Sequence, residues 1–262
     1  MKIARIKDKN GRITHAVAET DRYRIIEGSI FDKIEVTNET IPQSDARLLS
    51  PVDPPQVVAI GLNYRQHAQE SNMAVPTAPV VFVKTCNTVV GHGDSIILPT
   101  MAPNEVDYEA ELVIVIGKKA RNVPESLASD YILGYTCGND VSARDCQLRL
   151  DKQWARGKCF DTFAPIGPWI VTDLDGDKLN VKLTLNGNVM QNSNTSDMVF
   201  GCRQLVSYLS RCMTLLPGSI IMSGTPSGVG MGRKPQVWLK TGDTVTVEID
   251  GIGSLTNNVT NE

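Results

Sequence analysis

Short runs of β-branched and other apolar residues, each bounded by turn residues, recur along most of the chain. Runs of about four to eight residues have the length of strands, whereas helices in globular domains usually exceed about ten residues. Asn186-Gly187 and Asp250-Gly251 lie between such runs, and these dipeptides favour two-residue hairpin turns. We expect strands over 57–60, 80–84, 95–98, 111–116, 169–172, 181–185, 219–223 and 244–249. The sequence therefore predicts a mainly β fold with many antiparallel pairs.

Two segments have helical spacing instead. In 198–211, apolar residues recur every three or four positions after Asp197, a residue type that commonly caps a helix. In 142–150, Ser142 and Asp145 resemble a capping box. With these helices, the predicted fold class is α+β, mostly strands.

A proline cluster divides the chain. Pro51, Pro54 and Pro55 break any regular element, and such clusters commonly mark boundaries. We therefore expect a small N-terminal region over 1–52 and a larger domain over 53–262.

The charge balance disfavours polyanionic partners. The chain has 26 Lys and Arg against 29 Asp and Glu, a formal charge of -3, and no cluster of basic residues. We therefore expect binding to neither nucleic acid nor a membrane, and a small soluble substrate instead. Charges interrupt the N-terminal segment before it could form a signal peptide, so the predicted location is the cytoplasm. The six cysteines include no CxxC pair, which indicates reduced thiols rather than a disulfide or zinc site.

Acidic residues alternate in 107–111, just before an apolar run. Alternation places Asp107, Glu109 and Glu111 on one face of a strand, about 6.5 to 7 Å apart between successive members. They could form a solvated acidic face, or two of them could hold a cation if a third ligand joins. Asp140, after the run 131–137, is the candidate for that ligand, although it could also be an ordinary turn residue. Three carboxylates would select Mg²⁺ or Mn²⁺, with Ca²⁺ less suitable.

Two basic residues have neighbours that suit catalysis. His67 and Glu70 would share one face of a short helix, where the carboxylate could orient the imidazole and raise its basicity. The alternative is a surface ion pair. Lys158 lies among aromatic residues, so it would be partly buried and would need an anion, or else would extend from an apolar patch to solvent.

Taken together, these motifs resemble the fumarylacetoacetate hydrolase family. The resemblance covers about residues 53–262 and rests on five segments in the same order, 60–64, 107–111, 134–145, 158–165 and 224–226.

The resemblance implies a role for each candidate residue. Glu109, Glu111 and Asp140 match metal ligands, for Mg²⁺ or Mn²⁺, with Ca²⁺ possible in crystals. His67 and Glu70 match the catalytic dyad, Lys158 matches the lysine of the site, and Arg144, Gln147 and Thr225 match positions that line the substrate pocket. The family's catalytic domain is a mixed β-roll that usually forms a homodimer, and 147–156 corresponds to a lid.

The resemblance also limits the reaction. Because His67 and Glu70 are both present, we expect a hydrolase that activates water and cleaves the C–C bond of an acylpyruvate-like (fumarylpyruvate-like) 1,3-diketo acid. The alternatives are a decarboxylase of oxaloacetate or another 2-oxo acid, a hydroxymuconate-type isomerase, and a protein that binds a 2-oxo acid without catalysis. Specificity would be set by lid and pocket residues that the sequence does not place, such as Arg65, Gln66 and 71–77, so the acyl group stays open.

Overall fold

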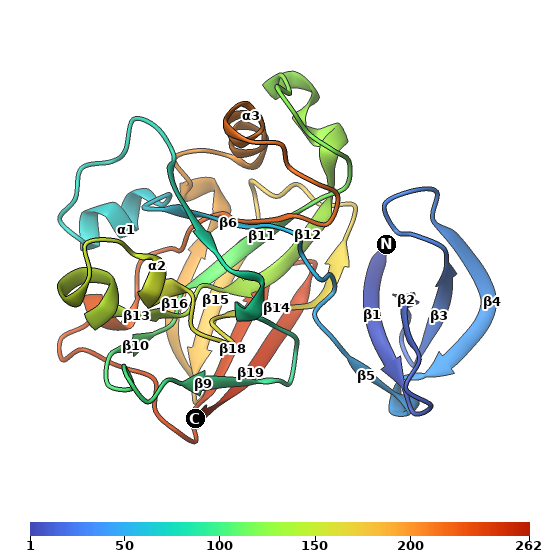
Figure 1. Cartoon of the computed structure of the whole chain (residues 1–262), viewed down its shortest axis with the longest axis horizontal. Helices are drawn as coiled ribbons and strands as arrows, with labels where there is room; N and C mark the ends of the chain where they lie inside the picture. The colour runs from blue at the N-terminus through green and yellow to red at the C-terminus, as the bar shows by residue number, and fades with distance from the viewer.

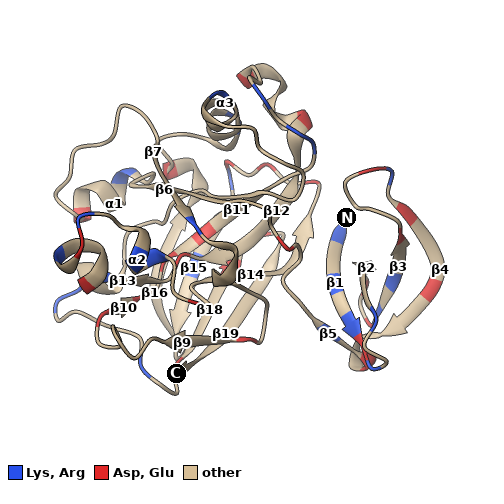
Figure 2. Ribbon diagram, viewed as in Figure 1, with Lys and Arg blue, Asp and Glu red and all other residues tan.

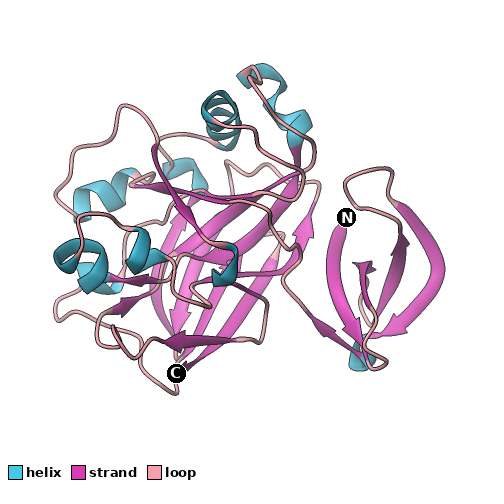
Figure 3. Cartoon of the chain, viewed as in Figure 1, coloured by secondary structure: helices cyan, strands magenta, loops and turns pink.

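The computed structural model describes residues 1–262, and strands dominate it (Figure 3). The longest sheet has twelve strands: β1 Lys2–Asp8, β2 Ile13–Ala18, β3 Arg22–Glu27, β4 Glu35–Pro42, β5 Ala46–Leu48, β6 Val57–Gly61, β7 Val80–Lys84, β8 Val89–Val90, β11 Ala110–Ile116, β12 Ile132–Asn139, β14 Ala164–Val171 and β17 Ile220–Met222. A second sheet has five strands: β9 Ser95–Leu98, β15 Asn180–Leu185, β16 Asn188–Asn194, β18 Thr244–Ile249 and β19 Gly253–Asn261. A two-stranded sheet joins β10 Val106–Asp107 to β13 Ser142–Ala143.

Helices are few and short. The α-helices are α1 Arg65–Glu70, α2 Ala155–Lys158 and α3 Cys202–Cys212, and a π-helical turn covers Cys146–Leu150. Turns of 3-10 helix cover Gln43–Asp45, Cys86–Thr88, Glu125–Tyr131, Thr195–Asp197 and Gly230–Gly232. The α+β class with mostly strands is confirmed.

Each strand expected from the sequence is present, with ends shifted by a few residues at most except in β14, which begins earlier. The Asn186-Gly187 turn joins β15 to β16, and both residues have positive φ, 52° and 79°. That backbone matches the twist of the two strands, which explains why the dipeptide is informative. Asp250-Gly251 also lies between two strands, β18 and β19, but the loop there has three residues, 250–252, and of these only Gly251 has positive φ, 75°.

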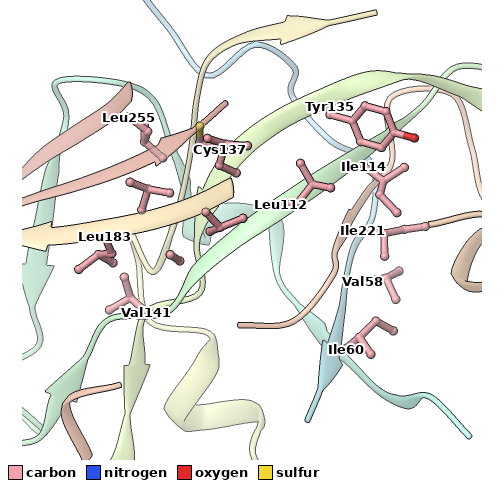
Figure 4. Packing of buried hydrophobic residues seen from close by; sticks show 14 of the residues in the cluster. Val58, Ile60, Leu112, Ile114, Tyr135, Cys137, Val141, Leu183, Ile221 and Leu255 are labelled. Carbon is pink, nitrogen blue, oxygen red and sulfur yellow. The ribbon is translucent and has the colours of Figure 1, made fainter. Parts of the chain in front are cut away.

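The two large sheets pack face to face around β11. Strands β11, β12 and β14 of the long sheet contact β15, β18 and β19 of the five-stranded sheet. Leu112 of β11 and Leu183 of β15 point into the core between the sheets (Figure 4). All seven residues of β11 are buried, because the strand is covered on both faces. The residues that precede it are therefore held on a rigid support.

The N-terminal strands form one end of the long sheet. β1 pairs with β14 through Lys2↔Val171 and Ile3↔Ile170, so the sheet continues from one region into the other. β1 to β5 nevertheless enclose a small core of their own and stand beside the main body (Figure 1). Charges of both signs lie along β1 and β3, whereas β4 carries only acidic residues (Figure 2). The boundary at residue 52 stays a prediction.

The helix expected over 198–211 begins later, at Cys202. The backbone of 198–200 bonds elsewhere: Val199 N donates to Asn63 O at 2.7 Å, and Phe200 N donates to Asn63 Oδ1 at 2.9 Å. The expected cap is also wrong, because Asp177 Oδ1 accepts from Cys202 N. Asp197 Oδ2 instead accepts from the backbone N of Gln66, at the start of α1.

The helix expected over 142–150 is reduced to its second half. Ser142 lies in β13, and its hydroxyl donates to Asp140 O at 2.9 Å instead of capping a helix. Asp145 Oδ1 accepts from Cys146 N at 2.7 Å and so caps the π-helical turn. The pairing of β13 with β10 consumes the residues that would have formed the first turn.

A glycine-rich segment, which we call the 224–233 loop, follows β17. Two of its glycines leave no room for a side chain. A Cβ at Gly228, where φ is 102°, would lie 2.2 Å from Met190 O, and a Cβ at Gly230 would lie 1.9 Å from Val237 O. The loop is therefore pressed against β16 and the segment that precedes β18.

Replacing Gly228 by Ala should destabilise the fold strongly. Gly187→Ala is the matched control, because Gly187 also has positive φ but a Cβ added there would have no heavy atom within 4 Å. The control should cost about 1 to 2 kcal/mol of unfolding free energy from backbone strain alone. We expect Gly228→Ala to cost at least twice as much in urea denaturation. Equal costs would show that the loop does not approach β16 this closely.

Candidate active site

One cavity of about 290 Å³ gathers the candidate residues. It lies beside the N-terminal end of β11 and is closed by α1, α2, the π-helical turn and the 224–233 loop. The candidates that line it are His67, Glu109, Glu111, Asp140, Arg144, Gln147, Lys158 and Thr225. Glu70, the remaining candidate, lies beside His67. The structure thus brings all of them to one place, and their individual roles stay predictions.

Three carboxylates converge in this cavity. Glu109, Glu111 and Asp140 each offer an oxygen, and these oxygens lie within 4.8 Å of one another. All three residues are at most 5% exposed, so the solvated acidic face that the alternation also allowed is not what forms. Asp140 joins them because β12 runs antiparallel to β11, with Ala110 opposite Asn139.

Glu111 is the least neutralised of the three. Its Oε2 accepts one hydrogen bond, from Gly224 N at 2.8 Å, and it has no cationic partner. Burial and the nearby carboxylates of Asp140 and Glu109 raise its pKa well above the usual value. A divalent cation would relieve this repulsion, and an all-oxygen donor set fits a hard ion. The residues therefore fit the metal site that the sequence predicts.

Buried cations offset the other two carboxylates. Lys158 Nζ lies 2.8 Å from Glu109 Oε2 and 2.6 Å from Asp140 Oδ2. Arg144 Nη2 lies 2.7 Å from Glu109 Oε1. Burial alone would raise the pKa of Glu109, but Arg144 and Lys158 lower it below its usual value. Burial alone would lower the pKa of Lys158, but Asp140 and Glu109 raise it, so Lys158 is an ammonium.

Lys84 is a site residue that the sequence did not single out. Its Nζ lies 2.5 Å from Asp140 Oδ1 and 3.1 Å from Val141 O, and its side chain is fully buried. Burial, together with the charge of Lys158, lowers its pKa despite the pull of Asp140. The only signal was a lysine that ends an apolar strand.

The predicted dyad is present. His67 Nδ1 lies 3.1 Å from Glu70 Oε2, and His67 is 7% exposed. Glu70 Oε1 also accepts from Gly228 N at 2.9 Å, which ties α1 to the 224–233 loop. Burial would raise the pKa of Glu70, but the hydrogen bonds from His67 and Gly228 lower it. Glu70 is therefore a carboxylate that holds the imidazole, not the surface partner of an exposed pair.

The residues predicted to line the pocket are themselves held in place. Arg144 Nη1 donates to Gln147 Oε1 at 2.9 Å. The hydroxyl of Thr225 donates to Ala110 O at 2.9 Å and accepts from Gln191 Nε2 at 2.8 Å. These contacts connect the pocket walls to β11 and β16.

The rest of the cavity is apolar. Phe82 and Trp154 pack edge to face with ring centroids 5.5 Å apart, and Lys158 Nζ lies 5.0 Å from the Phe82 centroid. Met73 and Leu148 are about half exposed, whereas the carboxylates are buried. The cavity therefore has a charged floor and an apolar rim.

No helix in the structure has the length and apolar character of a membrane span.

Family models match nearly the whole chain. The model described as fumarylacetoacetate (FAA) hydrolase C-terminal matches residues 56–260. The model described as Rv2993c-like, N-terminal matches residues 1–51.

Named relatives and a solved structure are similar to this chain. A fumarylacetoacetate hydrolase domain-containing protein 2 homolog of Dictyostelium discoideum is 52% identical over 237 residues, which cover 86% of this chain and 77% of the relative. Oxaloacetate tautomerase Fahd2a, mitochondrial, of Rattus norvegicus is 47% identical, covering 84% and 71%. The crystal structure of 5-carboxymethyl-2-hydroxymuconate delta-isomerase from Mycobacterium smegmatis superimposes with a TM-score of 0.91 at 41% identity, covering 100% of both chains.

Adding Mg²⁺ or Mn²⁺ should stabilise the protein through the three carboxylates. At about 100 times the dissociation constant, a bound ion contributes about 2.7 kcal/mol. For a chain of this size that corresponds to a rise in Tm of about 5 to 10 °C in a thermal scan. Glu111→Gln should remove most of this rise, because it deletes the ligand charge that no cation neutralises. Glu105→Gln, which removes a partly exposed carboxylate paired with Arg149, is the control. A rise that survives Glu111→Gln would place the ion elsewhere.

Proposed function

Because this chain belongs to the fumarylacetoacetate hydrolase family, we propose that it is a Mg²⁺- or Mn²⁺-dependent enzyme that interconverts the keto and enol forms of oxaloacetate or a closely related 2-oxo acid. The observation that carries the proposal is the dyad of His67 and Glu70, whose imidazole lines the same small cavity as three converging carboxylates. The names of relatives support this choice. Proteins named oxaloacetate tautomerase in rat, frog and cattle are 44 to 47% identical to this chain.

The charges of the cavity suit an anionic substrate. At and around the cavity, three cationic side chains lie among four carboxylates, so the cluster carries one net negative charge when every group is ionised. The cations are Lys84, Arg144 and Lys158, and the carboxylates are Asp107, Glu109, Glu111 and Asp140. A bound divalent ion would change this to one net positive charge. The loaded cavity would then attract a carboxylate, and its low-dielectric surroundings would strengthen that attraction.

The dyad supplies the proton transfer. With Nδ1–H donated to Glu70, His67 keeps Nε2 as a proton acceptor. Nε2 would take the proton from C3 of the keto acid, and the C–H electron pair would form the C2–C3 double bond while the carbonyl electrons move to O2. The negatively charged Glu70 stabilises the imidazolium that results. The enolate then takes a proton at O2 from a water molecule, and the imidazolium gives its proton to the hydroxide that this leaves, which completes the enol and restores neutral His67.

Lys158 acts electrostatically. Because Asp140 and Glu109 keep it protonated, its ammonium can stabilise charge that develops at O2 but is a poor proton donor. A metal ion held by Glu109, Glu111 and Asp140 would supply Lewis acidity for the 2-oxo acid.

Hydrolysis of an acylpyruvate, the reaction expected from the sequence, is the second candidate. The same dyad could activate a water molecule instead of a substrate carbon. The apolar rim of Met73, Leu148 and Trp154 would suit an acyl group that is larger and less polar than the C4 carboxylate of oxaloacetate. A solved structure that superimposes with a TM-score of 0.90 at 34% identity is named a fumarylacetoacetate hydrolase, from Exiguobacterium antarcticum.

The homodimer stays a prediction. The cytoplasmic location also stays a prediction, and several relatives carry the word mitochondrial in their names.

A substrate panel separates the candidate reactions. The protein with Mg²⁺ should accelerate the loss of enol absorbance when enol oxaloacetate is dissolved, without forming pyruvate in the NMR spectrum. His67→Asn should slow this reaction by about 100-fold or more, because it removes the base. His15→Asn is the control, since His15 lies on β2 and bonds Pro51 O.

The other outcomes identify the other reactions. Pyruvate from oxaloacetate would indicate a decarboxylase, and pyruvate with a free acid from an acylpyruvate would indicate the hydrolase. Consumption of none of these substrates would contradict the proposal.

A further inference from the structure

Asp107 precedes the metal-binding carboxylates in the same alternating pattern, yet it does not join them. Its side chain is fully buried, and both oxygens are occupied by donors. Oδ1 accepts from Tyr108 N at 2.9 Å and from Gly230 N at 2.7 Å. Oδ2 accepts from Arg144 Nε at 2.9 Å and from Met231 N at 3.0 Å. A carboxylate has about four acceptor positions, so none is left for a cation.

One group of donors belongs to a cationic wall of the cavity. Arg144 donates Nε to Asp107, and its Nη2 lies between Asp107 at 2.8 Å and Glu109 at 2.7 Å. Its Nη1 donates to Gln147, which leaves one Nη1 hydrogen for a ligand in the cavity. The guanidinium of Arg144 is held in one orientation because both its Nε and its Nη2 lie against Asp107 Oδ2.

The other donors belong to the 224–233 loop. The amides of Gly230 and Met231 donate to Asp107, and Met231 is one of the residues that line the cavity. A Cβ at Gly230 would lie 2.6 Å from Asp107 Oδ1, so the backbone approaches as closely as a glycine permits. This one carboxylate therefore holds two separate walls.

We infer that Asp107 is a positioning residue that sets the affinity of the cavity for a 2-oxo acid, by fixing the Arg144 guanidinium and the Met231 segment of the loop. The inference rests on the proposed function only in the identity of the ligand. Asp107 is buried behind the cavity wall and does not line the cavity itself, so it would act on binding through Arg144 and Met231 and leave the proton transfer by His67 largely intact.

Asp107→Asn is the direct test, because it keeps the shape of the side chain but turns one acceptor into a donor. The probe is oxalate with saturating Mg²⁺, since oxalate presents two adjacent carboxylate groups and cannot tautomerise. By calorimetry, the Kd for oxalate should rise by about 10-fold or more in the variant. The KM for oxaloacetate should rise by a similar factor while kcat changes by less than about threefold. Asp177→Asn, which removes a carboxylate that holds Cys202 N at the start of α3, should leave both constants unchanged.

Amide hydrogen exchange tests, without any ligand, whether Asp107 holds the 224–233 loop in place. Exchange at Gly230 and Met231 should be faster in Asp107→Asn than in the wild type. Arg144→Lys separates the two walls and also serves if Asp107→Asn does not fold. It should weaken oxalate binding but leave these two amides protected, because Asp107 still accepts from them.

The outcomes distinguish this inference from the proposed function. If amide exchange is unchanged in Asp107→Asn, Asp107 does not hold the loop. If the oxalate affinity is unchanged in this variant, Asp107 has no role in binding. If Asp107→Asn binds oxalate more weakly than the wild type, but the wild type does not turn over oxaloacetate, the positioning role holds and the proposed reaction fails. If the wild type does not bind oxalate, the proposed function and the role of Asp107 in binding both fail. The exchange data alone then show whether Asp107 holds the loop.

Discussion

Mutual repulsion of buried carboxylates is the constraint on which the rest of this structure depends. Glu109, Glu111 and Asp140 bring ligand oxygens within 4.8 Å of one another, away from water. Two like charges about 4 Å apart repel by about 4 kcal/mol even at an effective dielectric constant of 20. Such a cluster persists only where cations surround it and the backbone cannot yield. Lys84 and Lys158 supply the first condition, and the fully buried β11 supplies the second.

Neighbouring elements hold the carboxylates together against this repulsion. The five-stranded sheet covers β11 from one side, so the acidic end of β11 cannot move away from Asp140, which directly follows β12. The 224–233 loop closes the site and is fastened by acidic side chains, Glu70 at Gly228 and Asp107 at Gly230. Carboxylates near the cavity thus have two different tasks. Some are crowded together where a cation can bind them, and others are saturated by donors that hold the walls.

Much of this could be predicted from the sequence, because strand patterns and turn dipeptides are local signals. The helix starts could not be predicted. Asn63 bonds the backbone of 199–200 from 137 positions away in the chain, and Asp197 caps α1 instead of its own helix. The alternating acids and the spacing of His67 and Glu70 were visible, and the family resemblance brought the remaining site residues together. Lys84 is the last residue of an apolar strand and belongs to no local motif, and the separate task of Asp107 depends on donors from distant segments.

The central claim is that the three carboxylates form a metal site that serves a 2-oxo acid. Anomalous diffraction from crystals grown with Mn²⁺ and oxalate tests it most directly. We predict one strong anomalous peak bounded by oxygens of Glu109, Glu111 and Asp140, with oxalate density beside it in the cavity. Absence of the peak at saturating Mn²⁺, with Lys158 still paired to both Glu109 and Asp140, would contradict the account.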